Sequence, residues 1–275
     1  MPTAKRNRFS SSKTQKRFQV SRRVKSVDIT KFLPEFNGIP AAKVYNAPGN
    51  GELVLTLEKD QSVFMNGSTM IWMDSAISVK TQTSGFFAGL RRAFTGDSLF
   101  LTYFTGVSPK GNKICFAPHL PGDVTKLIIK PGQKRIVSTQ SVICCTSNVR
   151  LDVVMQARGF FTGQPFLSSV TVPIDSREPG VVWIGSFGAM NTIDIKAGER
   201  YQIENHNFMA CDGSVKYTLG MLGGLKSAFL SGEGFVMNFT GPCSIMIQNR
   251  KVMQLAHHLR PYLQEKNNMY RSLEL

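Results

Sequence analysis

From position 51 onward, short apolar or alternating runs of residues recur at intervals of about ten residues. Leu53–Leu57, Leu99–Phe104 and Phe235–Phe239 are typical runs, and each has the length of one β-strand. Turn-forming pairs such as Asn50-Gly51 and Pro131-Gly132 lie between the runs and supply residues that accept a positive φ or preset a turn. The pattern predicts an antiparallel all-β body over residues 51–250.

Helical periodicity is convincing only near the C-terminal end of the chain. Val252, Leu255 and Leu259 recur at i, i+3 and i+7, and Pro261 follows them. This pattern predicts a short helix over Lys251–Arg260 that packs on the sheet and ends before the proline. We assign residues 251–275 to this helix and a tail.

Fixed shifts along the sequence relate separate parts of the β body to one another. A shift of 66 carries Lys130-Pro-Gly132 to Lys196-Ala-Gly198 and Cys145 to Cys211, and a shift of 72 carries Trp72-Met73 to Cys144-Cys145. Such self-similarity is typical of tandem supersecondary units. We therefore expect three β modules packed as one body, over about residues 51–120, 121–185 and 186–250.

A glycine-rich loop motif is also repeated. Gly89-Leu-Arg-Arg-Ala-Phe94 matches Gly224-Leu-Lys-Ser-Ala-Phe229, which places Arg91, Arg92 and Lys226 at corresponding points. Solvation of a turn is the simpler interpretation of these bases. The alternative is a subunit contact or an anion site.

Composition narrows the class of protein. The chain has 275 residues, enough for one large or two small domains, and 42% of them are hydrophobic, so a core can be buried. No apolar run approaches the roughly 18 to 20 residues that cross a bilayer, and no secretory signal opens the chain, so we expect neither a membrane span nor classical secretion. The five cysteines, an odd number, favour free thiols in a reducing intracellular compartment.

Charge is concentrated at the N-terminal end, although the whole chain carries a formal net charge of +15. Residues 1–27 contain no acid, and we expect them to form a disordered arm, joined to the β body by a linker over 28–50. Four roles remain open for the arm: a solubilising tail, a binder of nucleic acid or another polyanion, an organelle transit peptide, or a contact with an anionic lipid surface. The candidate polyanion-binding residues are Lys5, Arg6, Arg8, Lys13, Lys16, Arg17, Arg22, Arg23 and Lys25.

The residue types used in catalysis and metal binding are scattered along the chain. His119 and His206 are isolated, and His257-His258 would point about 100° apart on a helix, so no set of ligands converges on a metal. The repeat places Cys144, Cys145 and Cys211 at equivalent positions, which favours apolar packing over a reactive nucleophile. We therefore predict no catalytic residues, no cofactor, no metal site and no enzymatic activity.

Several segments resemble the altered-inheritance-of-mitochondria family of tryptophan RNA-binding attenuator-like β proteins. They are Gln61–Met70, Gly85–Gly96, Phe100–Phe104 and Ser231–Val236 with Phe239–Pro242. The resemblance covers about residues 45–250 and leaves out the basic arm and the tail. It implies three short double-stranded β-helix modules and a homotrimer whose modules form a pseudo-ninefold ring. It implies no catalytic residue, and its fungal members are linked to mitochondrial inner-membrane organisation.

Three hypotheses follow from the sequence. The first is a non-enzymatic structural or scaffolding protein, a β-rich homotrimer that presents basic arms. The second is a nonspecific nucleic-acid-binding or polyanion-binding protein that acts through the arm. The third is a small-ligand sensor or an enzyme that uses a cleft between modules. Deletion of the arm distinguishes the first two, because only the second activity depends on its charges.

Overall fold

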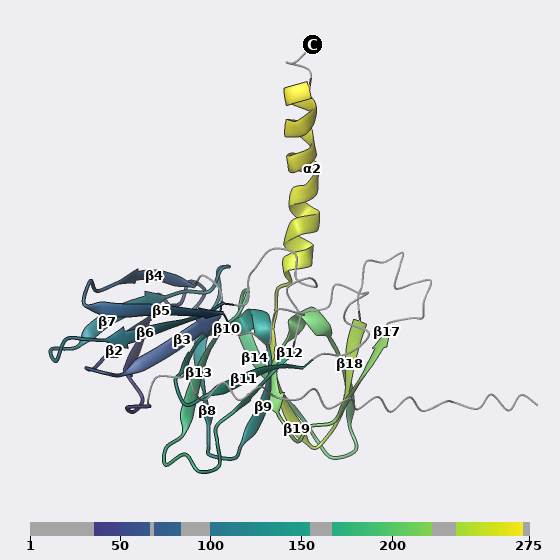
Figure 1. The fold of residues 1–275 in the computed structure, drawn as a ribbon. Coiled ribbons are helices and arrows are strands. Elements are labelled where there is room, and N and C mark those ends of the chain that lie inside the picture. The colour runs from purple at the N-terminus through teal and green to yellow at the C-terminus, as the bar shows by residue number, and fades with distance from the viewer. Residues whose placement is uncertain (1–35, 67–68, 84–99, 155–166, 222–234, 272–275) are drawn as a thin grey trace, which may run out of the picture.

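The computed structural model describes residues 36–66, 69–83, 100–154, 167–221 and 235–271. Antiparallel strands make up most of these residues, and one α-helix, α2, follows the last strand. Figure 1 shows α2 rising from a β body that extends from β4 at one end to β17 and β18 at the other. The predicted all-β class with a C-terminal helix is confirmed.

The strands fall into three units that follow one another along the chain. Unit 1 contains β2 (Glu52–Leu57), β3 (Ser62–Asn66), β4 (Met70–Met73), β5 (Ile77–Thr83), β6 (Phe100–Gly106) and β7 (Asn112–Phe116). Unit 2 contains β8 (Val124–Ile129), β9 (Lys134–Ser138), β10 (Val142–Thr146), β11 (Arg150–Val154), β12 (Leu167–Thr171) and β13 (Gly180–Gly185). Unit 3 contains β14 (Met190–Ile195), β15 (Arg200–Glu204), β16 (Phe208–Asp212), β17 (Tyr217–Met221), β18 (Phe235–Thr240) and β19 (Cys243–Gln248).

All three units have the same pattern of antiparallel pairs. In each, the sixth strand lies between the first and the third, and the fifth strand lies between the second and the fourth. The third strand carries a register shift at the same place in every unit, between Met70 and Trp72, between Val142 and Cys144, and between Phe208 and Ala210. A short 3-10 helix precedes the third strand in units 2 and 3: η3 (Thr139–Ser141) and η5 (Asn205–Asn207).

The turn between the first and second strands is also repeated. In unit 1 the side chain of Gln61 accepts a hydrogen bond from the backbone N–H of Glu58 at 2.9 Å. Gln133 does the same for Lys130, and Glu199 for Lys196, each at 3.0 Å. One side chain thus closes each turn.

Successive units are joined by pairing of their strands. The second strand of one unit pairs with the third strand of the next, β3 with β10 and β9 with β16, which produces two six-stranded sheets. The hydrophobic cores cross the same boundaries: Phe64 and Tyr103 of unit 1 pack with Val182 of unit 2 and Met209 of unit 3 in one cluster. The three units therefore share a continuous core.

Glycine is required where the units meet. Gly122 and Gly188 form a parallel bridge, and the N–H of Gly51 donates to the carbonyl of Gly122 at 2.8 Å. A Cβ on Gly122 would lie 1.9 Å from the carbonyl oxygen of Ser186, well inside van der Waals contact. A side chain there would clash with the backbone directly after β13, so this close approach needs glycine.

The segment 28–50, which we interpreted as a linker, contains an additional strand. β1 (Ala41–Tyr45) pairs antiparallel with β2, which makes unit 1's outer sheet four-stranded, in the order β1-β2-β7-β4. All five residues of β1 are exposed. The strand is held by its backbone hydrogen bonds to β2. Because neither of its faces is buried, its sequence has no alternating apolar pattern.

The C-terminal helix differs from the sequence prediction in two ways. α2 spans Val252–Arg271 and continues through Pro261, so the prediction that the helix ends before the proline is wrong. Proline removes the N–H that would bond to the carbonyl of His257, but its fixed φ is compatible with a helix, and water can solvate a carbonyl on an exposed helix. The prediction that this helix packs on the sheet is also wrong, because its described side chains are almost all exposed.

Candidate functional site

Two strands occupy the positions of junction strands without having a junction partner. β4, the third strand of unit 1, ends the four-stranded sheet, and β15, the second strand of unit 3, ends the sheet β15-β18-β17. Their counterparts β10, β16, β3 and β9 are the strands that join the units. Within the described part of the chain, β4 and β15 each pair on one side only. We call them the two free edges.

The side chains of β4 are more exposed than those of the corresponding strands β10 and β16. All five residues of β10 are buried, and so are the first four of β16. In β4, by contrast, Ile71, Trp72 and Met73 are 52%, 45% and 37% exposed. Three consecutive large apolar side chains at an open strand edge form a surface of the kind that proteins normally cover.

The other free edge is more polar but carries its own aromatic side chain. Tyr201 of β15 is 42% exposed, while Ile203, two residues on, is buried. The residue that corresponds to Tyr201 in β3 is Val63, which is fully buried. The two free edges thus expose side chains at positions that are covered where the same strands meet inside the chain.

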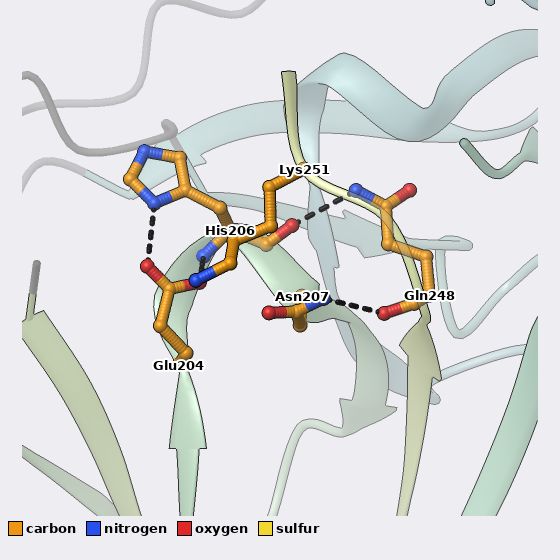
Figure 2. Close-up of polar contacts among 5 residues, drawn as sticks. All are labelled: Glu204, His206, Asn207, Gln248 and Lys251. Carbon is orange, nitrogen blue, oxygen red and sulfur yellow. Dashed lines mark hydrogen bonds and ion pairs between the residues drawn. The ribbon is translucent and has the colours of Figure 1, made fainter. Parts of the chain in front are cut away.

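A polar cluster lies at the base of α2, next to the β15 edge (Figure 2). The Glu204 carboxylate accepts hydrogen bonds from the backbone N–H of His206 at 3.0 Å and contacts the imidazole Nδ1 of His206 at 2.9 Å. The Nζ of Lys251, the residue before α2, lies 3.8 Å from the same carboxylate. The side-chain amide of Gln248 donates to the backbone carbonyl of His206 at 2.8 Å. The backbone carbonyl of Gln248 accepts a hydrogen bond from the side-chain amide of Asn207 at 2.7 Å.

This cluster lowers the pKa of Glu204. Burial acts in the opposite direction, but the hydrogen bond to the His206 side chain, the charges of His206 and Lys251, and the His206 N–H together outweigh it. Glu204 is therefore an anionic anchor that ties the end of β15 to the start of α2. The contacts can fix the base of the helix on the β body.

The cysteines lie in a setting that suppresses reactivity. Cys144, Cys145 and Cys211 are 0%, 0% and 2% exposed, as the repeat predicted. Burial raises the pKa of all three thiols, that of Cys211 to about 12. Cys115, also buried, and Cys243, half-buried, have raised pKa values for the same reason. A thiol with a raised pKa forms little of the thiolate that nucleophilic chemistry needs.

The residues singled out from the sequence separate into two groups. The nine bases of the arm lie outside the described residues, as do Arg91, Arg92 and Lys226, so those predictions stay untested. Among the described residues, no group of three or more His, Cys, Asp and Glu side chains is placed to hold a metal ion. No described helix is long and apolar enough to cross a membrane.

Sequence reasoning missed both free edges and the Glu204 cluster. The signal for the first was present, because the repeat places Trp72 and Met73 where the next unit has Cys144 and Cys145, and a terminal copy has no neighbour on one side. The predicted apolar packing holds for Cys144, Cys145 and Cys211, whereas Trp72 and Met73 at the equivalent positions are exposed in the single chain. The Glu204 cluster had no local signal in the sequence, because only the folded chain brings Lys251 close to Glu204.

Comparisons with known proteins agree with the architecture. A family model described as "Mitochondrial biogenesis AIM24" matches residues 45–250. The crystal structure of a protein from Streptococcus pyogenes is similar with a TM-score of 0.67 and 20% sequence identity, over 82% of this chain and 100% of that one. At this identity the likeness concerns the fold. A comparison with curated proteins returned no match.

Proposed function

The chain belongs to the mitochondrial biogenesis AIM24 family, and we propose that it is a non-enzymatic scaffold that assembles into a ring through its two free edges. In this proposal β4 of one copy pairs with β15 of the next, as β10 pairs with β3 and β16 with β9 inside the chain. The exposed apolar row of Ile71, Trp72 and Met73 on β4 is the observation that supports it most directly.

The internal junctions supply the register of the proposed contact. Cys145 lies opposite Phe64 at the first junction and Cys211 lies opposite Ile136 at the second. Applying the same repeat shifts places Met73 opposite Gln202 of the next copy. Trp72 would then face Ile203, and Asp74 would face Tyr201.

A contact between two different edges of the same molecule is a heterologous contact. It gives a closed ring when the rotation from one copy to the next closes, and an open filament when it does not. The family resemblance implies closure after three copies, so we propose a homotrimer. Such an assembly leaves neither free edge open.

Light scattering of the full-length protein at micromolar concentration tests this proposal. We expect a trimer for the natural chain and a monomer for the double variant Trp72→Lys, Met73→Lys, because two charges would be buried at each contact. Ile128→Lys is the matched control, since Ile128 is 50% exposed on β8, which pairs with β13 and with neither free edge, and this change should leave the trimer intact. A natural chain that is monomeric at this concentration would refute the assembly.

We propose no catalytic role for the thiols. The cysteines of the described core combine burial with raised pKa values, which is the opposite of an activated nucleophile. The family description supports a mitochondrial role in the broad sense of biogenesis. We propose that residues 1–27 act in targeting, in polyanion contact or in both; locating the full-length protein in cells and sequencing its mature N-terminus separates these roles.

A further inference from the structure

We propose that α2 is a docking helix for an anionic lipid surface, with its apolar stripe at the boundary between headgroups and acyl chains. The helix lies beyond the residues matched by the AIM24 family model, which ends at 250. The proposed docking surface on α2 is separate from the basic arm and from the two free edges.

The helix carries an apolar stripe. At 100° per residue, Val252, Leu255, Leu259, Tyr262 and Leu263 fall within an arc of about 100°. Gln254, His257, His258 and Arg260 occupy most of the remaining surface, together with Met253, Ala256 and Pro261. An amphipathic helix of this kind normally buries its stripe.

The stripe of α2 is not buried on its own molecule. Val252, Leu259, Tyr262 and Leu263 are 45%, 42%, 64% and 64% exposed, and only Leu255 is partly covered. Figure 1 shows the helix standing away from the sheets, with its base at the body. The contacts of Gln248 and Lys251 with residues of η5 and β15 hold that base in place (Figure 2).

Charge decides between the occupants that could cover the stripe. Residues 250–271, which include all of α2, contain one acid, Glu265, and five bases: Arg250, Lys251, Arg260, Lys266 and Arg271. A bundle of copies of α2 would bring these bases together, and one acid per copy cannot compensate them. An anionic lipid surface attracts the same charges by about 1 kcal/mol each, and it accepts leucine and valine side chains below the headgroups.

Tyr262 strengthens this choice. Tyrosine has an apolar ring and a polar hydroxyl, and such side chains favour the boundary between headgroups and acyl chains. Its exposure on the stripe beside Leu263 would place the ring at that boundary when the helix lies on the surface. The polar side of the helix, with Arg260, would face water and headgroups.

Flotation of the full-length protein with vesicles tests the proposal. We expect binding to vesicles of phosphatidylcholine with phosphatidylserine, and much weaker binding to phosphatidylcholine alone. The double variant Leu259→Gln, Leu263→Gln should weaken binding to the anionic vesicles about tenfold or more, because two apolar side chains no longer enter the interface. Met253→Gln is the matched control: it removes an exposed apolar side chain from the other side of the helix and should bind as the natural chain does.

A second readout keeps the test independent of the basic arm. Tryptophan emission from a Tyr262→Trp variant should shift to the blue when the anionic vesicles are added, beyond any change seen for the natural chain. Equal binding by the natural chain and the Leu259→Gln, Leu263→Gln variant would overturn the proposal and assign lipid binding to the arm. A change of oligomeric state in that variant, without vesicle binding by the natural chain, would overturn it in favour of a helix bundle.

Discussion

At the scale of single residues, the repeated turn between the first and second strands exposes a mismatch. Asp60 occupies the turn position held by Gly132 and Gly198 in the other units, and all three have positive φ: 65°, 75° and 84°. A residue with a Cβ is strained there, whereas glycine is not. We predict that Asp60→Gly raises the free energy of unfolding by up to about 1 kcal/mol, measured by urea denaturation.

The reverse change supplies the control. A Cβ on Gly198 would meet no atom within 4 Å, so Gly198→Asp adds backbone strain without a steric clash. This variant should lose stability by a similar amount. If Asp60→Gly lowers the free energy of unfolding, as Gly198→Asp is expected to do, backbone strain at Asp60 does not explain its stability.

The thiols give a second prediction at this scale. Four of the five cysteines are buried, and burial raises the pKa of each, so little thiolate is present at neutral pH. Titration of the native protein with Ellman's reagent should modify at most Cys243 rapidly, and all five should react after unfolding in guanidinium. Mass spectrometry without reductant should find no bridge; a stoichiometric intrachain disulfide would contradict the prediction.

Glu204 gives a prediction about pH. Its pKa is lowered in the folded protein, so its contribution to stability is present above the unfolded value of about 4.3 and is lost as pH falls through the lowered folded value. Glu204→Gln should therefore cost about 1 kcal/mol of unfolding free energy at pH 6 and progressively less below about pH 4. Denaturant titrations at several pH values measure this difference, and a difference that does not change with pH would argue against an ionic anchor.

At the scale of elements, the internal junctions make the register between copies testable. If β4 and β15 pair as β16 and β9 do, Asp74 of one copy lies opposite Tyr201 of the next. A variant with Asp74→Cys and Tyr201→Cys should form disulfide-linked oligomers up to the trimer on a non-reducing gel after mild oxidation. Asp74→Cys combined with Lys196→Cys is the out-of-register control, and efficient crosslinking of that control would refute the register.

The elements also show what the sequence can predict and where it stops. Alternation in Leu53–Leu57 reflects burial of every second side chain of β2, so the local pattern contained the answer. β1 could not be predicted in this way, because its five residues are exposed and its hydrogen bonds to β2 alone define it. The continuation of α2 through Pro261 was missed because the rule that proline ends a helix is a preference that an exposed helix can overcome.

At the scale of the whole molecule, exposure depends on neighbours that no local pattern specifies. Trp72 and Met73 have core character, and their counterparts Cys144 and Cys145 are buried because unit 1 lies beside unit 2. Nothing in the described chain lies beside β4 in the same way. A repeat array with one unfilled junction at each end suits the proposed ring, but the number of copies depends on the angle between units, which a sequence pattern does not encode.

The arm adds a property of the whole molecule that is independent of the β body. Nine positive charges without an acid in residues 1–27 should bind nucleic acid weakly and without sequence preference. If about six charges contact phosphates, the logarithm of the affinity for duplex DNA should fall with the logarithm of salt concentration with a slope near −5. Base discrimination should be poor, because only Phe9 and Phe18 could stack on bases.

Titration of one duplex at two salt concentrations, with the full-length protein and with a variant that begins at Asp28, measures the contribution of the arm. We expect the shortened variant to lose the salt-dependent binding while it keeps the oligomeric state of the full-length protein, because the free edges lie in the β body. Equal binding by the two proteins would move the polyanion site to the body, where Arg91, Arg92 and Lys226 are the first residues to replace. Absence of binding by both would leave residues 1–27 as a targeting or solubilising segment, and the scaffold proposal would stand without a nucleic-acid partner.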